Sequence, residues 1–258
     1  MNKSVEQPQV SIIVPCFARA DLTQVCIDSI LDYTGWKFEL ILVQEGEDEE
    51  ITKVFNNAEY HNNGEECKPI KLAHNKTPKG YSGALNTGLE QATGKYICFM
   101  NNDTVAVPGW MDEMLKCFEE NEDTGLVCPT FWGSGGKQSI DWNSDIEFDY
   151  VDNIFSIIGV CFVIPRTVLD VIGNWDEDYG HGGEDFDIVK RVQDADYSVY
   201  VARKSFIYHY GGASTRIVVG NDMAKAKANQ LAKLKIFSKK HNVPMEEIME
   251  KINLSNTI

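Results

Sequence analysis

The chain has 258 residues, 43% hydrophobic and 24% charged, a balance typical of a globular protein with one large core and unlike that of disordered or fibrous chains. Its formal net charge of -15 disfavours broad electrostatic attachment to nucleic acid or anionic lipid, because both are polyanions. No apolar run approaches the roughly 20 residues that cross a bilayer, and the opening segment MNKSVEQPQV lacks a signal-peptide pattern. The sequence therefore predicts a cytoplasmic protein without an integral membrane segment.

The cysteines are scattered, odd in number and free of any C-x-x-C pair. They are Cys16, Cys26, Cys67, Cys98, Cys117, Cys128 and Cys161. This pattern predicts neither a disulfide framework nor a zinc site. Most of these residues lie in apolar runs, which is typical of buried thiols.

The amino-terminal part of the chain alternates between strand-like and helix-like patterns. Residues 10–14 (VSIIV) are predicted as a buried strand, and Asp21 followed by Gln24 predicts the capped start of a helix. Residues 38–43 and 70–73 are predicted as the next two strands. The alternation predicts one α/β domain whose central sheet is mixed but mostly parallel, with helices on both faces.

A glycine-rich segment, KGYSGALNTG, follows at residues 79–88. Apolar residues recur from there at helical spacing and predict a helix that Gly94 closes, and residues 96–100 (YICFM) are predicted as the next strand. Pro108 predicts the start of another helix, and residues 126–128 a further short strand. The alternating pattern thus extends to the middle of the chain.

Regular patterning lapses at residues 131–151, where glycine, serine, aspartate and aromatic residues predict a long surface excursion of the kind that often holds binding residues. Its aromatic side chains, which either stack on a ligand ring or cover the core, are Trp132, Trp142, Phe148 and Tyr150. Order resumes at residues 157–164. A helix from Pro165 to Gly173 and a second one from about Gly183 are predicted next.

Two short strands, at residues 198–201 and 206–208, precede an amphipathic helix whose apolar residues recur from Met223 to Phe237. A basic run from Lys225 to Lys240 overlaps this helix. We interpret the run as a solvated helix face; the alternative is a local basic groove, or a surface by which a peripheral enzyme docks on a membrane.

Asp103 and His209 are candidate metal ligands. Asp103 lies just past the carboxyl end of the strand at 96–100, where open α/β sheets place their ligand crevice. A carboxylate there can hold Mg²⁺ or Mn²⁺ against diphosphate oxygens, or it can simply cap the turn that follows. His209 follows another predicted strand, and a neutral imidazole is a competent Mn²⁺ ligand, or else a packed, hydrogen-bonded side chain.

Carboxylates and glycines gather around the predicted start of the helix at Gly183. The cluster consists of Asp176, Asp178, Glu184, Asp185 and Asp187, with Gly180, Gly182 and Gly183 between them. Attack by a sugar hydroxyl needs a base to take its proton, and a carboxylate at the edge of a pocket can do this. Alternatively, Glu184 and Asp185 only complement the helix dipole.

Four segments of the chain resemble the inverting family-2 glycosyltransferases of the GT-A fold. In chain order they read VSIIVPCFAR, KGYSGALNTGLEQATGKYICFMNNDTVAVPGW, IIGVCFVIPRTVLDVIGNWDEDYGHGGEDFDIVKRV and IYHYGGAS. The resemblance implies a single GT-A-like domain and a metal-dependent transferase that moves a sugar from a nucleotide-diphosphate sugar to an acceptor hydroxyl. It further implies direct displacement with inversion, a UDP-sugar as the first expectation, and Mn²⁺ or Mg²⁺ as cofactor.

The resemblance also assigns roles to individual positions. The residues implied to border the nucleotide sugar are Pro15, Gln44, Glu45, Asn75, Gly80, Asn86, Asn101 and Asn102. Asp103 would be the principal metal ligand, in the place of the D-x-D motif, and His209 would complete the metal site. Asp185 would be the general base of an E-D pair, and Glu184 would hold the acceptor or tune the base.

The chain departs from the family pattern at three places. Gln44 and Glu45 stand where the family usually has an aspartate that contacts the base, so the identity of the nucleotide stays open. Asn101 replaces the first aspartate of D-x-D, and Leu85 stands where an arginine is frequent. Metal binding is then expected through Asp103 and His209.

The resemblance implies an extension at residues 1–9, the transferase domain at 10–215 and a helical extension at 216–258 that packs on the domain. Within the domain, residues 10–103 would form the nucleotide-binding half and 104–215 the acceptor and catalytic half. The acceptor stays open among a saccharide, a lipid-linked glycan, a protein and a modified nucleic acid.

Other enzyme classes fit less well. A dinucleotide-dependent oxidoreductase is disfavoured because PCFARAD, after the first strand, lacks the G-x-G-x-x-G pattern. A sugar-nucleotide pyrophosphorylase is disfavoured because its basic, glycine-rich phosphate loop is missing from the same place. The alternative that stays open is a non-catalytic module that binds a sugar nucleotide or a glycan on the same fold.

Overall fold

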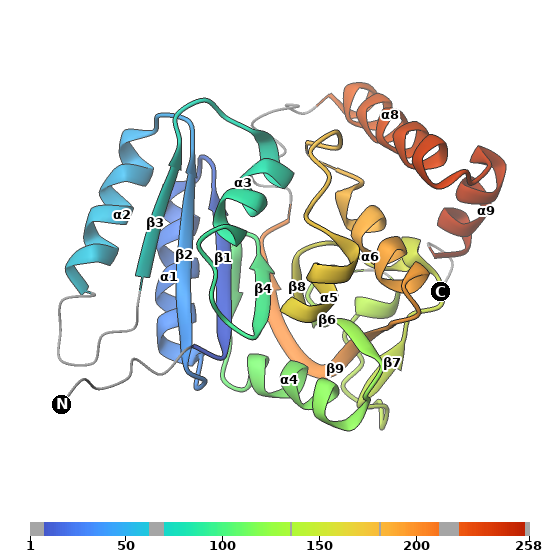
Figure 1. Cartoon of the computed structure of the whole chain (residues 1–258), viewed down its shortest axis with the longest axis horizontal. Helices are drawn as coiled ribbons and strands as arrows, with labels where there is room; N and C mark the ends of the chain where they lie inside the picture. The colour runs from blue at the N-terminus through green and yellow to red at the C-terminus, as the bar shows by residue number, and fades with distance from the viewer. Residues whose placement is uncertain (1–7, 62–69, 135, 181, 212–221, 256–258) are drawn as a thin grey trace.

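One continuous sheet organises the molecule, and its strands come from both halves of the chain (Figure 1). The computed structural model describes residues 8–61, 70–134, 136–180, 182–211 and 222–255. Within these ranges nine strands form the sheet, in the order β3-β2-β1-β4-β8-β6-β9-β5, with β7 paired to β9. The predicted α/β class with a mixed central sheet is confirmed.

The first half of the sheet is parallel. Its strands are β1 (Val10–Cys16), β2 (Phe38–Glu45), β3 (Ile70–Asn75) and β4 (Tyr96–Met100). Side chains alternate between the faces of a strand, so Ile12 and Val14 enter one core cluster whereas Ile13 enters the other. Continuous apolar runs such as VSIIV suit a sheet that is covered on both sides.

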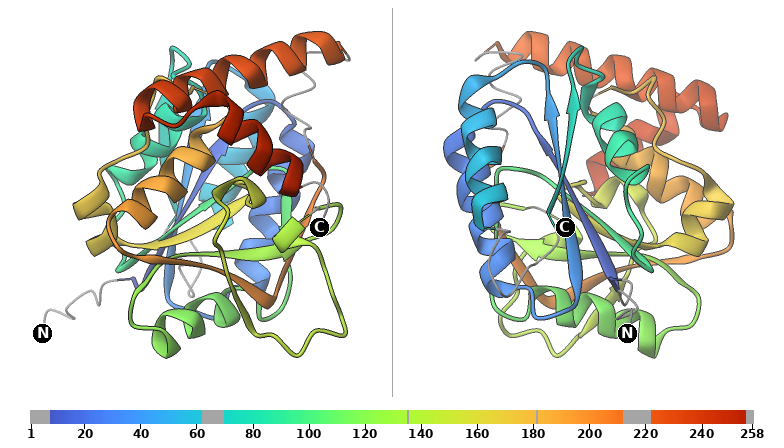
Figure 2. Two further views of the ribbon diagram at one scale, coloured as in Figure 1. Left: turned by 90° about the vertical axis from the view of Figure 1, so that its right-hand side faces the viewer. Right: turned by 60° about the vertical axis from the view of Figure 1, so that its left-hand side comes forward.

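Helices cover the two faces of this parallel half (Figure 2). The helices α1 (Ala20–Tyr33) and α2 (Glu49–His61) pack on one face, and α3 (Gly80–Leu89) packs on the other. The helix α3 approaches β1 closely, because a Cβ atom on Gly88 would lie 2.4 Å from Cγ2 of Ile13. At the other end of the helix, the Gly80 amide donates to Glu45, so the amino end of α3 lies at the carboxyl end of β2.

The second half of the sheet is mostly antiparallel. Its strands are β5 (Thr104–Ala106), β6 (Thr124–Phe131), β7 (Phe148–Tyr150), β8 (Cys161–Pro165) and β9 (Ser198–His209). The strand β8 joins the halves by pairing antiparallel with β4, with Phe99 opposite Phe162. The helix α4 (Trp110–Glu120) covers one face, and α5 (Arg166–Ile172) and α6 (Glu184–Asp194) cover the other.

Two helices end the chain, α8 (Met223–His241) and α9 (Met245–Ser255). Leu234, Phe237 and Ile248 are buried in the same core cluster as α6, so this carboxy-terminal part packs on the domain (Figure 1). Residues 224–232 of α8 are exposed along their whole length. None of the helices in the described ranges is both long and apolar enough to cross a bilayer.

Several details differ from the sequence expectations. Asp21 does not cap α1: it lies inside the first turn and pairs with the side chain of Arg19, which occupies the cap position in a left-handed conformation. The helix α3 ends at Leu89 rather than at Gly94, because the Gly94 amide donates to the Ser11 hydroxyl at the start of β1. The helix α2, which the acidic segment 44–50 did not suggest, begins at Glu49.

The carboxy-terminal half shows further differences. The helix α4 begins at Trp110, two residues after Pro108. The two strands expected at 198–201 and 206–208 are one strand, β9, with a register irregularity against β6 between them. The described cysteines are buried and free, as predicted, whereas Cys67 and the proposed domain boundary at residue 215 lie outside the described residues.

Candidate active site

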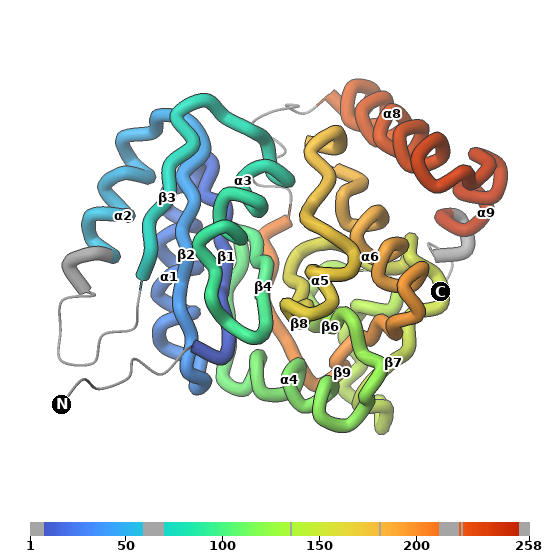
Figure 3. The backbone as a smooth tube through the Cα atoms, in the orientation of Figure 1, coloured from blue at the N-terminus to red at the C-terminus, as the bar shows by residue number. Residues whose placement is uncertain are grey.

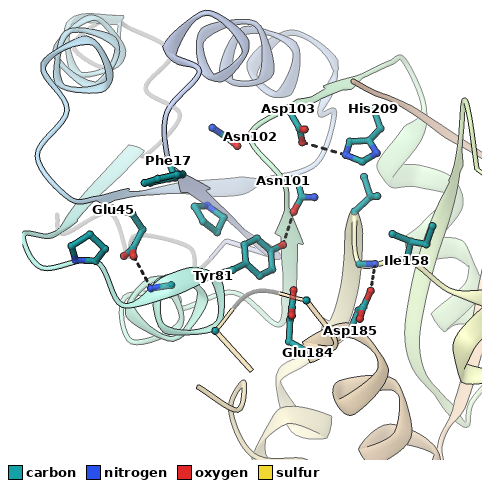
Figure 4. A pocket seen from close by; sticks show the side chains of 17 residues that line it. Phe17, Glu45, Tyr81, Asn101, Asn102, Asp103, Ile158, Glu184, Asp185 and His209 are labelled. Atoms are coloured by element: carbon teal, nitrogen blue, oxygen red, sulfur yellow. Dashed lines mark hydrogen bonds and ion pairs between the residues drawn. The ribbon is translucent and has the colours of Figure 1, made fainter. Parts of the chain in front are cut away.

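A pocket of about 570 Å³ opens at the carboxyl ends of β1 and β4 (Figure 4). From β1 the chain proceeds to β2 and β3 on one side, and β4 then lies on the other side of β1. The carboxyl ends of β1 and β4 therefore flank a topological switch point, where the connections diverge and leave a crevice.

Most of the residues expected at the site line this pocket. They are Pro15, Glu45, Gly80, Asn101, Asn102, Asp103, Glu184, Asp185 and His209. Six elements contribute them: the ends of β1, β2, β4 and β9, and the first turns of α3 and α6. Residues far apart in the sequence thus meet in one cavity.

Asp103 and His209 lie side by side on one wall. The strands β5 and β9 pair antiparallel, and the Tyr210 amide donates to the Asp103 carbonyl at 3.0 Å, so this pairing fixes the two residues next to each other. His209 Nε2 lies 3.3 Å from Asp103 Oδ1. The His209 ring rests edge-on against Phe131, which fixes the plane of the imidazole.

These two side chains suit a divalent cation such as Mn²⁺. A carboxylate oxygen and an imidazole nitrogen that already lie within 3.3 Å of each other can both reach a single ion. In the described ranges no group of three or more histidine, cysteine or acidic side chains gathers as a metal cage. A Mg²⁺- or Mn²⁺-type site needs no such cage, because it usually combines one or two protein ligands with substrate phosphates and water.

Glu184 and Asp185 lie across the pocket from Asp103 and His209 (Figure 4). Gly183, with φ of 89°, precedes α6 in a left-handed conformation, and the helix begins at Glu184. Asp185 Oδ2 accepts a hydrogen bond from the Gly159 amide at 3.1 Å, and Oδ1 accepts one from the Phe186 amide at 2.9 Å. The Asp185 carboxylate is therefore held in one orientation.

Burial raises the pKa of both carboxyls. For Asp185, desolvation is the largest cause, and the amide hydrogen bonds from Gly159 and Phe186 lower the pKa in part. For Glu184, desolvation is again the largest cause, and the negative charge of Asp185 raises the pKa further. Glu184 Oε2 is buried without a hydrogen-bond partner among the described residues. Ionisation of one carboxyl therefore disfavours ionisation of the other.

Tyr81, which the sequence did not single out, lines the same pocket. Its hydroxyl donates a hydrogen bond of 2.6 Å to Asn101 Oδ1. Desolvation raises the Tyr81 pKa, and the charges of Glu184 and Asp185 raise it further, so the hydroxyl keeps its proton and remains a donor. The Asn101 oxygen is thus engaged by Tyr81, which leaves the Asn101 amide nitrogen to donate to a ligand.

Glu45 lines the pocket, but its carboxylate binds the protein itself. The strand β2 extends two residues beyond the predicted one and buries Glu45 at its end. Glu45 Oε2 accepts hydrogen bonds from the Lys79 and Gly80 amides at 2.7 and 3.0 Å, and Oε1 accepts one from Asn75 Nδ2. Glu45 therefore caps the amino end of α3 from the wall of the pocket.

Three other expected nucleotide contacts lie outside the pocket lining. The Gln44 amide donates to the Gly46 and Asp48 carbonyls, and so holds the turn before α2. Asn75 is buried beside Glu45. Asn86 donates to the Trp175 carbonyl and accepts from the Trp175 amide, so it ties α3 to the segment before α6. All three stabilise the walls of the pocket, a role that depends on tertiary contacts.

The pocket also includes Phe17, just after Pro15, and two residues that no sequence signal singled out, Ile158 and Gly159. Gly159 has a specific steric role, because a Cβ atom there would lie 2.8 Å from Asp185 Cβ. In the sequence, Gly159 is an isolated glycine between two isoleucine- and valine-rich runs. Its steric role could not be predicted from this pattern, because Asp185, the residue that it contacts, comes from another part of the chain.

Comparison with known proteins identifies the family. The model of glycosyl transferase family 2 matches residues 11–173, so the chain belongs to that family and is a glycosyltransferase domain. It is 26% identical over 232 residues to the O-antigen biosynthesis protein RfbC of Myxococcus xanthus, covering 81% of this chain and 18% of that protein. It is 31% identical over 170 residues to an uncharacterized glycosyltransferase of Rickettsia bellii, covering 66% of this chain and 23% of that protein.

Solved structures show the same fold. A mannosyltransferase of Pyrobaculum calidifontis, in complex with GDP-Man and Mn²⁺, superposes with a TM-score of 0.63 at 18% identity, covering 83% of this chain and 61% of that one. GalNAc-T7, with UDP, GalNAc and Mn²⁺, superposes with a TM-score of 0.66 at 14% identity, covering 96% and 57%. At these identities the likeness shows the GT-A fold. This chain spans only a part of each protein to which it is similar.

Proposed function

We propose that this domain transfers a sugar from a nucleotide-diphosphate sugar to an acceptor hydroxyl, by direct displacement with inversion and with Mn²⁺ or Mg²⁺ as cofactor. The observation that carries the proposal is the arrangement of two pairs of side chains in one pocket at the topological switch point. Glu184 and Asp185, the acid pair, face Asp103 and His209 across this pocket (Figure 4). Membership of family 2 and the donor and metal ions bound by the two structural neighbours support it.

Asp185 is the proposed general base. Its carboxylate is fixed by the Gly159 and Phe186 amides, and each carboxylate oxygen keeps a lone pair with which to accept the proton of an acceptor hydroxyl. Burial raises its pKa, which makes the Asp185 carboxylate a stronger base than an exposed aspartate. Glu184 lines the pocket beside it, where it would hold the acceptor or tune the base.

Asp103 and His209 are the proposed metal ligands, and a bound metal would neutralise the charge that the diphosphate leaving group develops. The Asn101 amide nitrogen, oriented by Tyr81, is placed to donate to the donor substrate on the same side of the pocket. Because the base and the metal ligands approach from opposite sides, the arrangement suits attack opposite the leaving group, which inverts the anomeric carbon.

The donor is tested by a panel of nucleotide sugars with Mn²⁺ or Mg²⁺ and no acceptor, in which released nucleoside diphosphate is measured. A UDP-sugar is our first expectation, and GDP-sugars belong in the panel because one structural neighbour binds GDP-Man. Hydrolysis of one donor, abolished by a chelator, would support the transferase. Nucleotide-induced stabilisation without hydrolysis, even with candidate acceptors added, would instead support the non-catalytic binding module.

A further inference from the structure

The acidic loop, residues 174–180, forms part of the pocket floor and leads into the acid pair. Gly180 lines the pocket, and its carbonyl accepts a hydrogen bond from the Ser82 amide of α3 at 3.1 Å. A Cβ atom on Gly80 would lie 3.3 Å from Gly180 Cα, so the loop and the amino end of α3 are in close contact. The position of this loop therefore sets where Glu184 and Asp185 stand relative to α3.

The opposite side of the acidic loop is held by α8 (Figure 3). Lys233 Nζ donates a hydrogen bond to the Tyr179 carbonyl. Lys240 Nζ forms ion pairs with Asp176 and, at 2.8 Å, with Asp178, and it lies 5.4 Å from the centre of the Tyr179 ring. Two lysines of α8 thus hold the acidic loop from above, while α3 holds it from the other side.

Contacts between the carboxyl half of α8 and the rest of the domain fix the positions of these two lysines. Helical spacing puts Lys233, Phe237 and Lys240 on one side of the helix, and Phe237 is fully buried against Phe155. His241 Nε2 lies 2.8 Å from Asp187 Oδ1 in the first turn of α6, and Arg191 Nε donates to Asp187 Oδ2 at 2.8 Å. This anchoring ties α8 to the same helix that carries the acid pair.

Lys233 also adds a positive charge near Glu184. Two charged groups act on Glu184, Asp185 beside it on α6 and Lys233 on α8, and Glu184 in turn acts on Tyr81 of α3. Burial and the Asp185 charge raise the Glu184 pKa, whereas the Lys233 ammonium lowers it. Lys233 is not among the residues that line the pocket, so any influence on the reaction acts through the loop and the acid pair.

We propose that the helix α8 is a functional part of the active site, in which Lys233 and Lys240 are positioning residues that hold the acidic loop and the acid pair in place. This inference rests on the proposed transferase function. The family match ends at residue 173, so neither the acid pair nor α8 lies within the part of the chain that the family model describes.

The test compares Lys233→Met and Lys240→Met with Lys235→Met and Lys239→Met, matched controls that lie exposed on the same helix. We expect donor hydrolysis to fall roughly ten- to a hundredfold in the first two variants, as for a displaced catalytic group, and to stay near wild type in the controls. Hydrogen exchange at the Ser82 amide, which donates to Gly180, is expected to quicken in the same two variants.

The pH–rate profile separates positioning from simple loss of fold. The Lys233 ammonium lowers the pKa of Glu184, so its removal should raise that pKa. The acidic limb of the profile, which reports ionisation of Glu184 and Asp185, is then expected to move to higher pH. Lys233→Arg keeps the charge and should restore the limb. Equal activity and equal Ser82 exchange in Lys233→Met and Lys235→Met would overturn the inference. An inactive wild type would instead count against the proposed function, and the exchange measurement would still decide whether α8 holds the loop.

Discussion

Asp185 is the general base in our proposal, and a substitution can remove its basicity while keeping its hydrogen bond with the Gly159 amide. Asp185→Asn keeps an oxygen that accepts the Gly159 amide but cannot take a proton. We expect turnover to fall about 10²- to 10⁴-fold, the usual contribution of a positioned base, while donor nucleotide binds with unchanged affinity. Turnover near that of the wild type would remove Asp185 from the mechanism.

Asp103 has a different role, in the binding of the metal and the donor. Asp103→Ala leaves His209 as the remaining protein ligand of the proposed site. Because the carboxylate supplies the negative charge, we expect Mn²⁺ binding, followed by electron paramagnetic resonance without donor, to weaken at least about tenfold. Asn101→Ala is the control, because the Asn101 oxygen is engaged by Tyr81, and it should leave Mn²⁺ affinity unchanged.

Glu184 makes stability depend on pH. Its pKa is raised in the folded protein, so the folded state keeps a proton that the unfolded state releases above about pH 4.3. The stability gained from this proton is present at low pH and is lost as pH rises through the raised pKa. Glutamine does not titrate, so Glu184→Gln does not lose this stability as pH rises. The difference in melting temperature, variant minus wild type, should therefore increase from about pH 4 towards pH 9. A difference that does not change with pH would contradict the assignment.

At the scale of elements, the turn before β8 and the first turn of α6 are closely fitted to each other. Gly159→Ala would place a Cβ atom 2.8 Å from Asp185 Cβ, and must shift either the turn or the aspartate. We expect turnover to fall roughly ten- to a hundredfold with unchanged nucleotide affinity. Gly35→Ala is the matched control, because its Cβ would meet no atom within 4 Å. A Gly159→Ala enzyme with full activity would show that the fit is not needed.

Different strands and helices contribute different residues to the site. The carboxyl ends of the parallel strands β1 and β4 form one side of the pocket, whereas the antiparallel strands β8 and β9 bring Gly159 and His209 to it. The helix α3 contributes its amino end, capped by Glu45 from β2 rather than by a residue of its own. This division explains why glycines gather in the segment KGYSGALNTG: the helix must approach both the sheet and the acidic loop.

At the scale of the whole molecule, a buried polar cluster lies at the amino ends of the parallel strands, opposite the pocket. Glu39, 2% exposed at the start of β2, accepts hydrogen bonds from Ser11 and from the Thr93 amide and hydroxyl, and pairs with Lys71 at 2.6 Å. Burial raises the Glu39 pKa, but the bonds from Lys71, Ser11 and Thr93 outweigh it and lower the pKa overall. The cluster joins β1, β2, β3 and the segment before β4.

Glu39→Gln should therefore destabilise the fold without touching the pocket. The lowered pKa means that the stability contributed by the carboxylate is present above about pH 4 and is lost as pH falls through the folded pKa. We expect a loss of about 1–3 kcal/mol in urea unfolding at pH 7, narrowing towards pH 3. Glu50→Gln, which breaks an exposed ion pair, should change stability by less than about 0.5 kcal/mol. An equal loss at both pH values would contradict this account.

Sequence patterns were enough to predict the α/β class, the positions of the strands up to β4, and the segments that carry Asp103, Glu184, Asp185 and His209. Strand runs and their alternation are local patterns, because burial on both faces of a parallel sheet demands apolar residues throughout. The resemblance to family 2 lies in those same segments, and the family match at residues 11–173 confirms it over the part of the chain that carries Asp103.

The hydrogen-bond partners of the buried polar residues could not be predicted from the sequence, because they come from distant parts of the chain. Glu45, Asn75 and Asn86 satisfy amides and carbonyls of neighbouring elements, a demand that exists only once those groups are buried together. Tyr81 meets Asn101, and Lys233 meets Tyr179, across long sequence separations. A local pattern specifies which residues are polar or apolar, whereas the partner of a buried polar atom is set by the packing of the whole chain.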